Sequence, residues 1–314
     1  MTLPQVRITL GEGSTPLVPA PRLSERLGLD VHLKLEFLNP TGSFKDRGMA
    51  VAVSRAVEDG VRAVICASTG NTAASAAAYA ARAGLLAVVL EPEGAVASGK
   101  LAQARALGAK VLEVRGSFDD ALDAARELGS RGDFALVNSL SPHRIEGQKA
   151  AAHEIVDELG GAPDALALPY GGGGNTRAYF KGFSEAGALP RFVLGQAADR
   201  AKTVASAIRI TAPAHADAVQ EALMATSGVV VTLADAEILE AWRALAHEEG
   251  VFCEPASAAS VAAAARAGLE PGSRVVCVIT GHGLKDPETA VLGAPPPIPV
   301  DPDPDSIAAA VERA

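Results

Sequence analysis

The fold is decided by the stretch Asn39-Pro40-Thr41-Gly42-Ser43-Phe44-Lys45-Asp46-Arg47-Gly48-Met49. Asparagine, proline and glycine at its start favour a turn, and Ser43 is a suitable N-cap for a helix over 44–53. We therefore expect Lys45 in a first helical turn, where unpaired backbone N–H groups and the positive dipole end disfavour the ammonium form. A partly neutral lysine suits Schiff-base chemistry. The alternative is an exposed lysine that pairs with Asp46.

Composition limits the class of protein. Hydrophobic residues make up 48% of the 314 residues and aromatic residues only 4%, which is typical of a soluble α/β enzyme. The formal net charge of −9 argues against a nucleic-acid partner. No apolar stretch reaches the roughly 18 residues of a membrane span, and Met1 to Leu10 lack the apolar core of a signal peptide, so we expect a cytoplasmic protein.

The cysteines and histidines do not predict a metal site. The six histidines form no cluster with metal-ligand spacing, so we expect no bound metal. The cysteines are scattered in apolar surroundings and are expected to be buried free thiols: Cys66, Cys253 and Cys277.

Alternating strand-like and helix-like runs predict a parallel sheet covered by helices. Apolar strands are expected at 63–67, 87–90, 110–114 and 134–137, with helical runs between them. We expect residues 41–141 to form a small domain. Residues 1–40 and 142–314 would form the large domain, in which 295–314 are a proline-rich tail.

Polar loops follow two of these strands. Ser68, Thr69, Asn71 and Thr72 lie where a strand leads into a helix, which predicts an anion site or an ordinary capped turn. The segment 137–149 brings an arginine, an asparagine and a serine to another strand end. They are able to hold a phosphate, although the arginine alternatively pairs with a surface carboxylate: Arg144, Asn138 and Ser139.

Two further strand ends are candidate ligand positions. Gly171, Gly172, Gly173 and Gly174, followed by Asn175, lie between a strand and a helix expected from residue 177. Such a glycine run lets backbone N–H groups approach a phosphate, although a flexible turn has the same composition. Thr280 ends a strongly apolar strand over 274–279.

Together these motifs resemble the pyridoxal-phosphate (PLP) enzymes of fold type II, the tryptophan synthase β family. The segments 11–17, 40–47 and 252–260 resemble the threonine synthases in particular. The resemblance implies an α/β fold with two parallel-sheet lobes, the smaller inserted in the larger. It also implies PLP as cofactor, a small amino-acid substrate and a homodimer.

The resemblance also implies a role for each motif. Lys45 would form the aldimine with PLP and act as acid and base, and Asn71 would contact the 3′-oxygen of the cofactor. The PLP phosphate would lie against Asn175 and the glycine run 171–174, here called the glycine cup. Thr280 would bind the pyridine nitrogen. The substrate carboxylate would be held by Ser68, Thr69 and Thr72, and a substrate phosphate by Asn138, Ser139 and Arg144.

These roles imply the conversion of O-phospho-L-homoserine and water to L-threonine and phosphate. A threonine or serine dehydratase of the same fold is the alternative, because it needs no pocket for a substrate phosphate. The all-glycine character of Gly172 and Gly173 favours that dehydratase slightly. A non-catalytic relative that binds an amino acid is disfavoured, because Lys45 and the cofactor contacts are all present.

Overall fold

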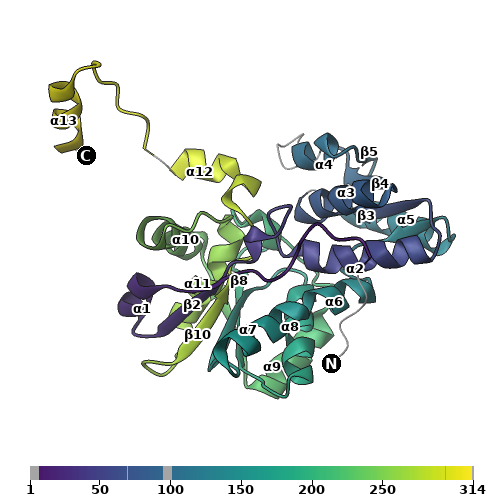
Figure 1. The fold of residues 1–314 in the computed structure, drawn as a ribbon, viewed down its shortest axis with the longest axis horizontal. Helices are drawn as coiled ribbons and strands as arrows, with labels where there is room; N and C mark the ends of the chain where they lie inside the picture. The colour runs from purple at the N-terminus through teal and green to yellow at the C-terminus, as the bar shows by residue number, and fades with distance from the viewer. Residues whose placement is uncertain (1–6, 69, 95–100, 294, 313–314) are drawn as a thin grey trace.

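The computed structural model describes residues 7–68, 70–94, 101–293 and 295–312, and these form two sheets with covering helices (Figure 1). The larger sheet has six strands in the order β1-β2-β10-β7-β8-β9. Their bounds are β1 Leu17–Pro19, β2 Asp30–Lys34, β7 Ala165–Pro169, β8 Arg191–Ala197, β9 Val229–Leu233 and β10 Arg274–Val278. All neighbours are parallel except β1, a short antiparallel edge strand that the sequence did not predict.

Helices cover both faces of the larger sheet. Helices α1 (Pro21–Leu27), α10 (Asp235–Glu249) and α11 (Pro255–Arg266) cover one face. Helices α7 (Ala150–Leu159), α8 (Gly174–Glu185) and α9 (Ala216–Thr226) cover the other. Strand residues alternate between the two cores, since Val275 and Cys277 join the first and Val276 and Val278 the second. This alternation follows from the two-residue period of a strand.

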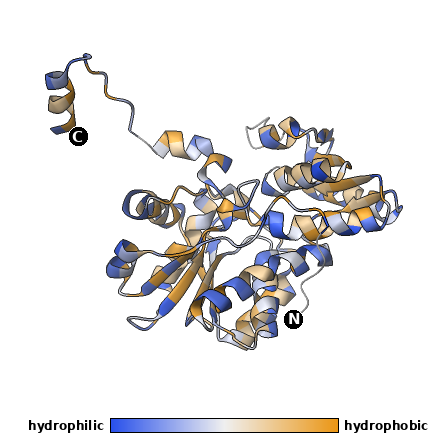
Figure 2. Ribbon diagram, viewed as in Figure 1, coloured by the Kyte–Doolittle hydropathy of each residue, from blue (hydrophilic) through white to orange (hydrophobic). Residues whose placement is uncertain are grey.

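The smaller sheet has four parallel strands in the order β5-β4-β3-β6. Their bounds are β3 Ala63–Ala67, β4 Leu86–Pro92, β5 Lys110–Val114 and β6 Phe134–Leu136. Helices α2 (Lys45–Glu58), α3 (Asn71–Ala83) and α4 (Ala102–Ala106) cover one face, and α5 (Phe118–Ser130) covers the other. The strands of both sheets are the most hydrophobic parts of the ribbon in Figure 2.

Some helix starts agree with the sequence, and others differ. Ser117 caps α5 in a capping box with Asp120, as expected. Helix α2 begins at Lys45 with Phe44 as its N-cap, so Ser43 is not the cap that was predicted. The single helix expected over 146–159 is two helices, α6 (Pro142–Gln148) and α7, which meet at Lys149.

Short 3₁₀ turns and two C-terminal helices complete the described part of the chain. Short 3₁₀ turns lie at Glu36–Leu38, Ser206–Ile208 and Gly283–Lys285. Helices α12 (Pro287–Gly293) and α13 (Pro304–Glu312) end the described chain, and α13 lies apart from both sheets beyond an extended segment (Figure 1). No described helix is long and apolar enough to cross a membrane. The domain boundaries stay a prediction, although the four-stranded sheet falls within 41–141.

Candidate active site

Three neighbouring parallel strands of the larger sheet bring the predicted motifs to one edge. Strand β2 leads to the Lys45 turn, β10 to the Thr280 turn and β7 to the glycine cup, and β10 lies between the other two. Backbone hydrogen bonds join the first two turns: Phe44 N donates to Thr280 O (3.1 Å) and His282 N donates to Gly42 O (2.9 Å). The carboxyl edge of a parallel sheet is a ligand position.

Lys45 is the first residue of α2. Burial and, second to it, the positive charge of Arg144 together lower the pKa of Lys45 to about 7, against the opposing charge of Glu254. The amine is therefore partly neutral near neutral pH. The Nζ atom lies 4.2 Å from the centre of the Phe44 ring. The expected first-turn position is confirmed, and desolvation is the main cause of the neutral amine.

The glycine cup fits a phosphate. Gly173 has φ +83°, and a Cβ there would lie 2.7 Å from Val219 Cγ2, so this position requires glycine. Helix α8 begins at Gly174, three residues earlier than predicted, which puts Asn175 and Thr176 in its first turn. Asn175 Nδ2 and Thr176 Oγ1 are buried and have no hydrogen-bond partner within the described part of the chain. Buried polar atoms of this kind are suited to an anion at a helix N-terminus.

The Thr280 hydroxyl forms a hydrogen bond with the hydroxyl of Ser257, a fully buried residue of α11. The two Oγ atoms are 2.9 Å apart, and Ser257 Oγ also accepts from the backbone N–H groups of Thr280 and Gly281, each at 3.0 Å. Ser257 therefore fixes the orientation of the threonine that is predicted to face the pyridine nitrogen.

The predicted carboxylate loop begins α3 and contacts the larger lobe. Asn71 Nδ2 donates to both carboxylate oxygens of Glu254 at 3.1 Å. Ser68 Oγ accepts from Gly70 N (3.2 Å) and Ala73 N (3.3 Å), which leaves its own O–H free to donate to a ligand. Thr72 is half-buried in the first turn of α3, and Thr69 lies outside the described residues.

Arg144 is a fully buried residue of α6 that packs against Gly48, one helical turn beyond Lys45 in α2. Its Nη1 donates to Val137 O (2.9 Å), and its Nε and Nη2 have no partner among the residues that are described. A Cβ at Gly48 would lie 2.8 Å from Nε, so glycine at this position makes room for the guanidinium. Burial lowers the pKa of Arg144 to about 10, so the group stays positive at neutral pH. Within the described part of the chain, Arg144 forms no ion pair with a surface carboxylate.

The predicted phosphate contact of Asn138 stays a prediction, and most of the side-chain amide is already engaged within the protein. Asn138 Oδ1 accepts from Ala67 N (3.0 Å) and Nδ2 donates to Ala67 O (2.9 Å), so the amide joins β3 to the segment after β6. Only the second Nδ2 proton stays available to a ligand. The main role of Asn138 is therefore to hold two strand ends together. The carbonyl of Ser139 accepts from His215 Nε2 (3.0 Å).

The residues present fit PLP. A lysine amine with a pKa of about 7 is able to react with an aldehyde, and the glycine cup offers partnerless donors to a phosphate. Thr280 offers a neutral hydroxyl, which would moderate the electron withdrawal of the pyridine ring. Within the described ranges, no three metal-ligating side chains lie together.

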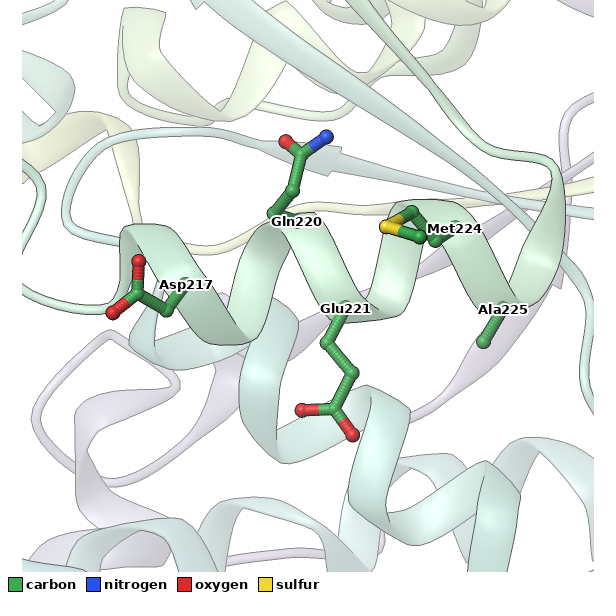
Figure 3. Close-up of a pocket in the computed structure, with 5 residues that line it drawn as sticks. All are labelled: Asp217, Gln220, Glu221, Met224 and Ala225. Atoms are coloured by element: carbon green, nitrogen blue, oxygen red, sulfur yellow. The ribbon is translucent and has the colours of Figure 1, made fainter.

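Two surface hollows lie away from these motifs. One has a volume of about 650 Å³ and lies on one face of α9. Figure 3 shows its lining residues, in which Gln220 and Glu221 extend away from each other. Its lining also includes Asp217, Met224 and Ala225. The other, about 290 Å³, lies over the smaller sheet and is mainly apolar. No predicted site residue lines either hollow, and a single helix face does not enclose a ligand.

Sequence analysis assigned no role to three residues of the site. Ser257 orients Thr280, and His215 contacts both the glycine cup and Ser139. Glu254 accepts both hydrogen bonds from Asn71. Burial raises the pKa of Glu254, although the amide of Asn71 lowers it. The sequence offers no signal for these contacts, because each joins segments more than 20 residues apart.

The comparisons with known proteins agree with this geometry. The family model for pyridoxal-phosphate dependent enzymes matches residues 8–281. A threonine synthase of Mycobacterium leprae is 52% identical over 94% of this chain and 88% of that protein. A threonine synthase of Synechocystis sp. is 52% identical over 90% of this chain and 80% of that protein.

The fold is also found in a solved structure. Maize serine racemase superposes with a TM-score of 0.78 at 19% identity, over 89% of this chain and 91% of that one. At that identity the likeness shows the fold alone. The chain belongs to the pyridoxal-phosphate-dependent enzyme family, and within it to the group of the threonine synthases.

Proposed function

We propose that this protein is a threonine synthase that converts O-phospho-L-homoserine and water to L-threonine and phosphate. The names of its relatives, at about 50% identity over most of the chain, support this function. The observation in the structure that carries it is the buried guanidinium of Arg144, with two partnerless nitrogens close to Lys45. A dehydratase has no substrate phosphate for such a group to bind.

PLP, when bound, supplies an electron sink for the negative charge that develops on the substrate. Lys45 would hold the cofactor through its amine and would then move protons at the substrate carbons. A pKa of about 7 lets this amine both accept and donate a proton near neutral pH. Gly171, Gly172, Gly173, Gly174 and Asn175 would hold the cofactor phosphate, and Thr280 and Asn71 the ring.

Arg144 would bind the substrate phosphate and stabilise its charge as the bond to the substrate carbon breaks. A buried guanidinium with two free N–H groups is able to hold two phosphate oxygens at once. The Ser139 hydroxyl would add a hydrogen bond, and Asn138 would act chiefly by fixing the loop. Ser68, Thr69 and Thr72 would hold the substrate carboxylate at the start of α3.

The setting of the reaction is also part of the proposal. The protein would act in the cytoplasm as a homodimer, without a nucleic-acid partner, in keeping with its net charge of −9 and its free cysteines. The large domain would comprise 1–40 and 142–314, and the small domain 41–141.

A paired assay of the PLP-loaded protein tests the function. One tube holds O-phospho-L-homoserine, and the other holds L-threonine or L-serine. We expect phosphate and threonine to form in equal amounts in the first tube. Ammonia and a 2-oxo acid in the second tube, with no product in the first, would mean that the protein is a dehydratase.

A further inference from the structure

His215 lies between the two segments that are proposed to bind phosphate. It is 6% exposed and precedes α9. Its backbone N–H donates to Gly172 O (3.0 Å), and its Nε2 is 3.0 Å from Ser139 O. The imidazole also lines the cup, because a Cβ at Gly174 would lie 3.5 Å from Nε2. One residue therefore contacts the glycine cup and the segment that carries Arg144.

The partners of His215 define its tautomer. Ser139 O is a carbonyl and only accepts, so Nε2 carries the proton. Nδ1 then has a lone pair, and Arg177 Nη1 lies 3.4 Å from it as a donor. Burial lowers the pKa of His215, which agrees with a neutral ring. Both ring nitrogens are thus engaged, and neither is available to take a proton from a substrate.

The cup and the Ser139 segment also lie close together. A Cβ at Gly174 would lie 3.5 Å from Ser139 Cβ, so a side chain there would be in contact with the segment. The cup follows β7 in one sheet, and Ser139 follows β6 in the other. Asn138 attaches the second segment to β3, within its own sheet. The hydrogen bond from His215 to Ser139 joins the segment to the other sheet.

We propose that His215 is a positioning residue that fixes the distance between the cofactor-phosphate cup and the substrate-phosphate segment, through its hydrogen bonds to Gly172 and Ser139. This proposal rests on the proposed function in one respect, which is the assignment of the Ser139–Arg144 segment to the substrate phosphate. His215 does not touch the reacting atoms and acts through the two backbone segments that it joins.

Two matched substitutions test this role. His215→Gln keeps an N–H donor that reaches about as far from the backbone as Nε2 does. The side chain of His215→Asn is one bond shorter, so it loses the hydrogen bond to Ser139 O. Asparagine is a favoured N-cap, so the start of α9 is not weakened in the second variant. His247→Leu, at an exposed position in the last turn of α10, is the control.

Two affinities are measured by titration: PLP with the apoprotein, and inorganic phosphate with the PLP-loaded protein. We expect His215→Asn to weaken both about five- to tenfold, because a buried carbonyl loses its donor. His215→Gln and His247→Leu should stay within about twofold of wild type. Thermal melting checks that each variant is folded.

Several results would overturn the proposal. These are wild-type affinities in His215→Asn, an equal loss in His215→Gln, or a loss confined to one of the two ligands. If the wild type does not turn over O-phospho-L-homoserine, the proposed function fails. The two affinities still decide the role of His215 in that case, because neither depends on turnover.

Discussion

At Lys45 the buried surroundings lower the pKa of the amine. Burial is the largest cause, and the charge of Arg144 is the next. The sequence showed that a lysine begins a helix, but it did not show that an arginine about 100 residues later would lie beside it. A pKa near 7 is the property that lets one residue bind an aldehyde and exchange protons.

The pH dependence of PLP binding tests this pKa. Above about pH 7 the amine is neutral, so the rate of PLP incorporation into apoprotein should rise to a plateau with a midpoint near 7. Nα-acetyl-lysine, measured in parallel, corrects for the ionisation of free PLP. Arg144→Gln removes a positive neighbour and should move the midpoint to higher pH. A wild-type midpoint near that of Nα-acetyl-lysine would contradict the pKa.

At the scale of elements, the glycine cup requires a backbone conformation that only glycine adopts without strain. Gly173→Ala puts a Cβ at φ +83° and 2.7 Å from Val219 Cγ2. We expect a loss of about 1–3 kcal/mol of stability and weaker PLP binding. Gly161→Ala, where a Cβ would meet nothing within 4 Å, should change neither. Melting temperature and PLP titration of both variants check this, and equal behaviour would exclude a steric requirement at Gly173.

Sequence patterns predicted elements better than their ends. The apolar runs at 63–67 and 110–114 are strands with the expected bounds. Helix α8 starts earlier than expected. The prediction left Gly174 and Asn175 out because glycine and asparagine are poor helix formers, but the first turn of a helix accepts such residues. The edge strand β1 has only three residues, too few for a periodic pattern.

The candidate site was predictable as a set of motifs, and its internal contacts were not. Lys45, the glycine cup and Thr280 meet because their strands are neighbours. The hydrogen bonds of Asn138 with Ala67 and of Thr280 with Ser257 join segments that are distant in the sequence. A single sequence carries no signal for such pairs.

At the scale of the whole molecule, a buried ionic network holds the start of α2 to the larger lobe. Arg47 binds Glu36 Oε2 (2.7 Å) and Glu154 Oε1 (2.6 Å), and Lys34 Nζ binds Glu154 Oε2 (2.9 Å). Burial alone would raise the pKa of Glu154, but hydrogen bonding and charge from Arg47 and Lys34 lower it to about 2. The network attaches the lysine helix to β2 and α7.

Acid titration of stability tests this network. Because its folded pKa lies below the ordinary value of 4.5, Glu154 stabilises the fold above that pH and the contribution is lost as pH falls toward 2. Glu154→Gln should lower the free energy of unfolding by about 1–3 kcal/mol at neutral pH. Below about pH 5 the melting temperature of this variant should depend less on pH than that of wild type. Glu158→Gln, on the same helix but 42% exposed, should have less effect. Parallel curves for wild type and Glu154→Gln would contradict the assignment.

The C-terminal segment contributes little to the described core. Only Ala310 is buried within 295–312, and Val311 is 71% exposed. A chain that ends at residue 294 should keep its melting temperature within about 1 °C and its catalytic rate. Circular dichroism and the turnover assay measure both, and a loss of activity in a folded chain would assign the tail a role in the site.

The most direct test of the account is the effect of Arg144→Gln on kcat/KM for O-phospho-L-homoserine. Arg243→Gln, at an exposed arginine of α10, is the control. Loss of charge-assisted hydrogen bonds to the phosphate should lower kcat/KM about 10²- to 10³-fold in Arg144→Gln. PLP content and melting temperature should stay near wild type, and Arg243→Gln should stay within about threefold. Equal kcat/KM in Arg144→Gln and wild type would contradict the claim that this guanidinium selects a phosphorylated substrate.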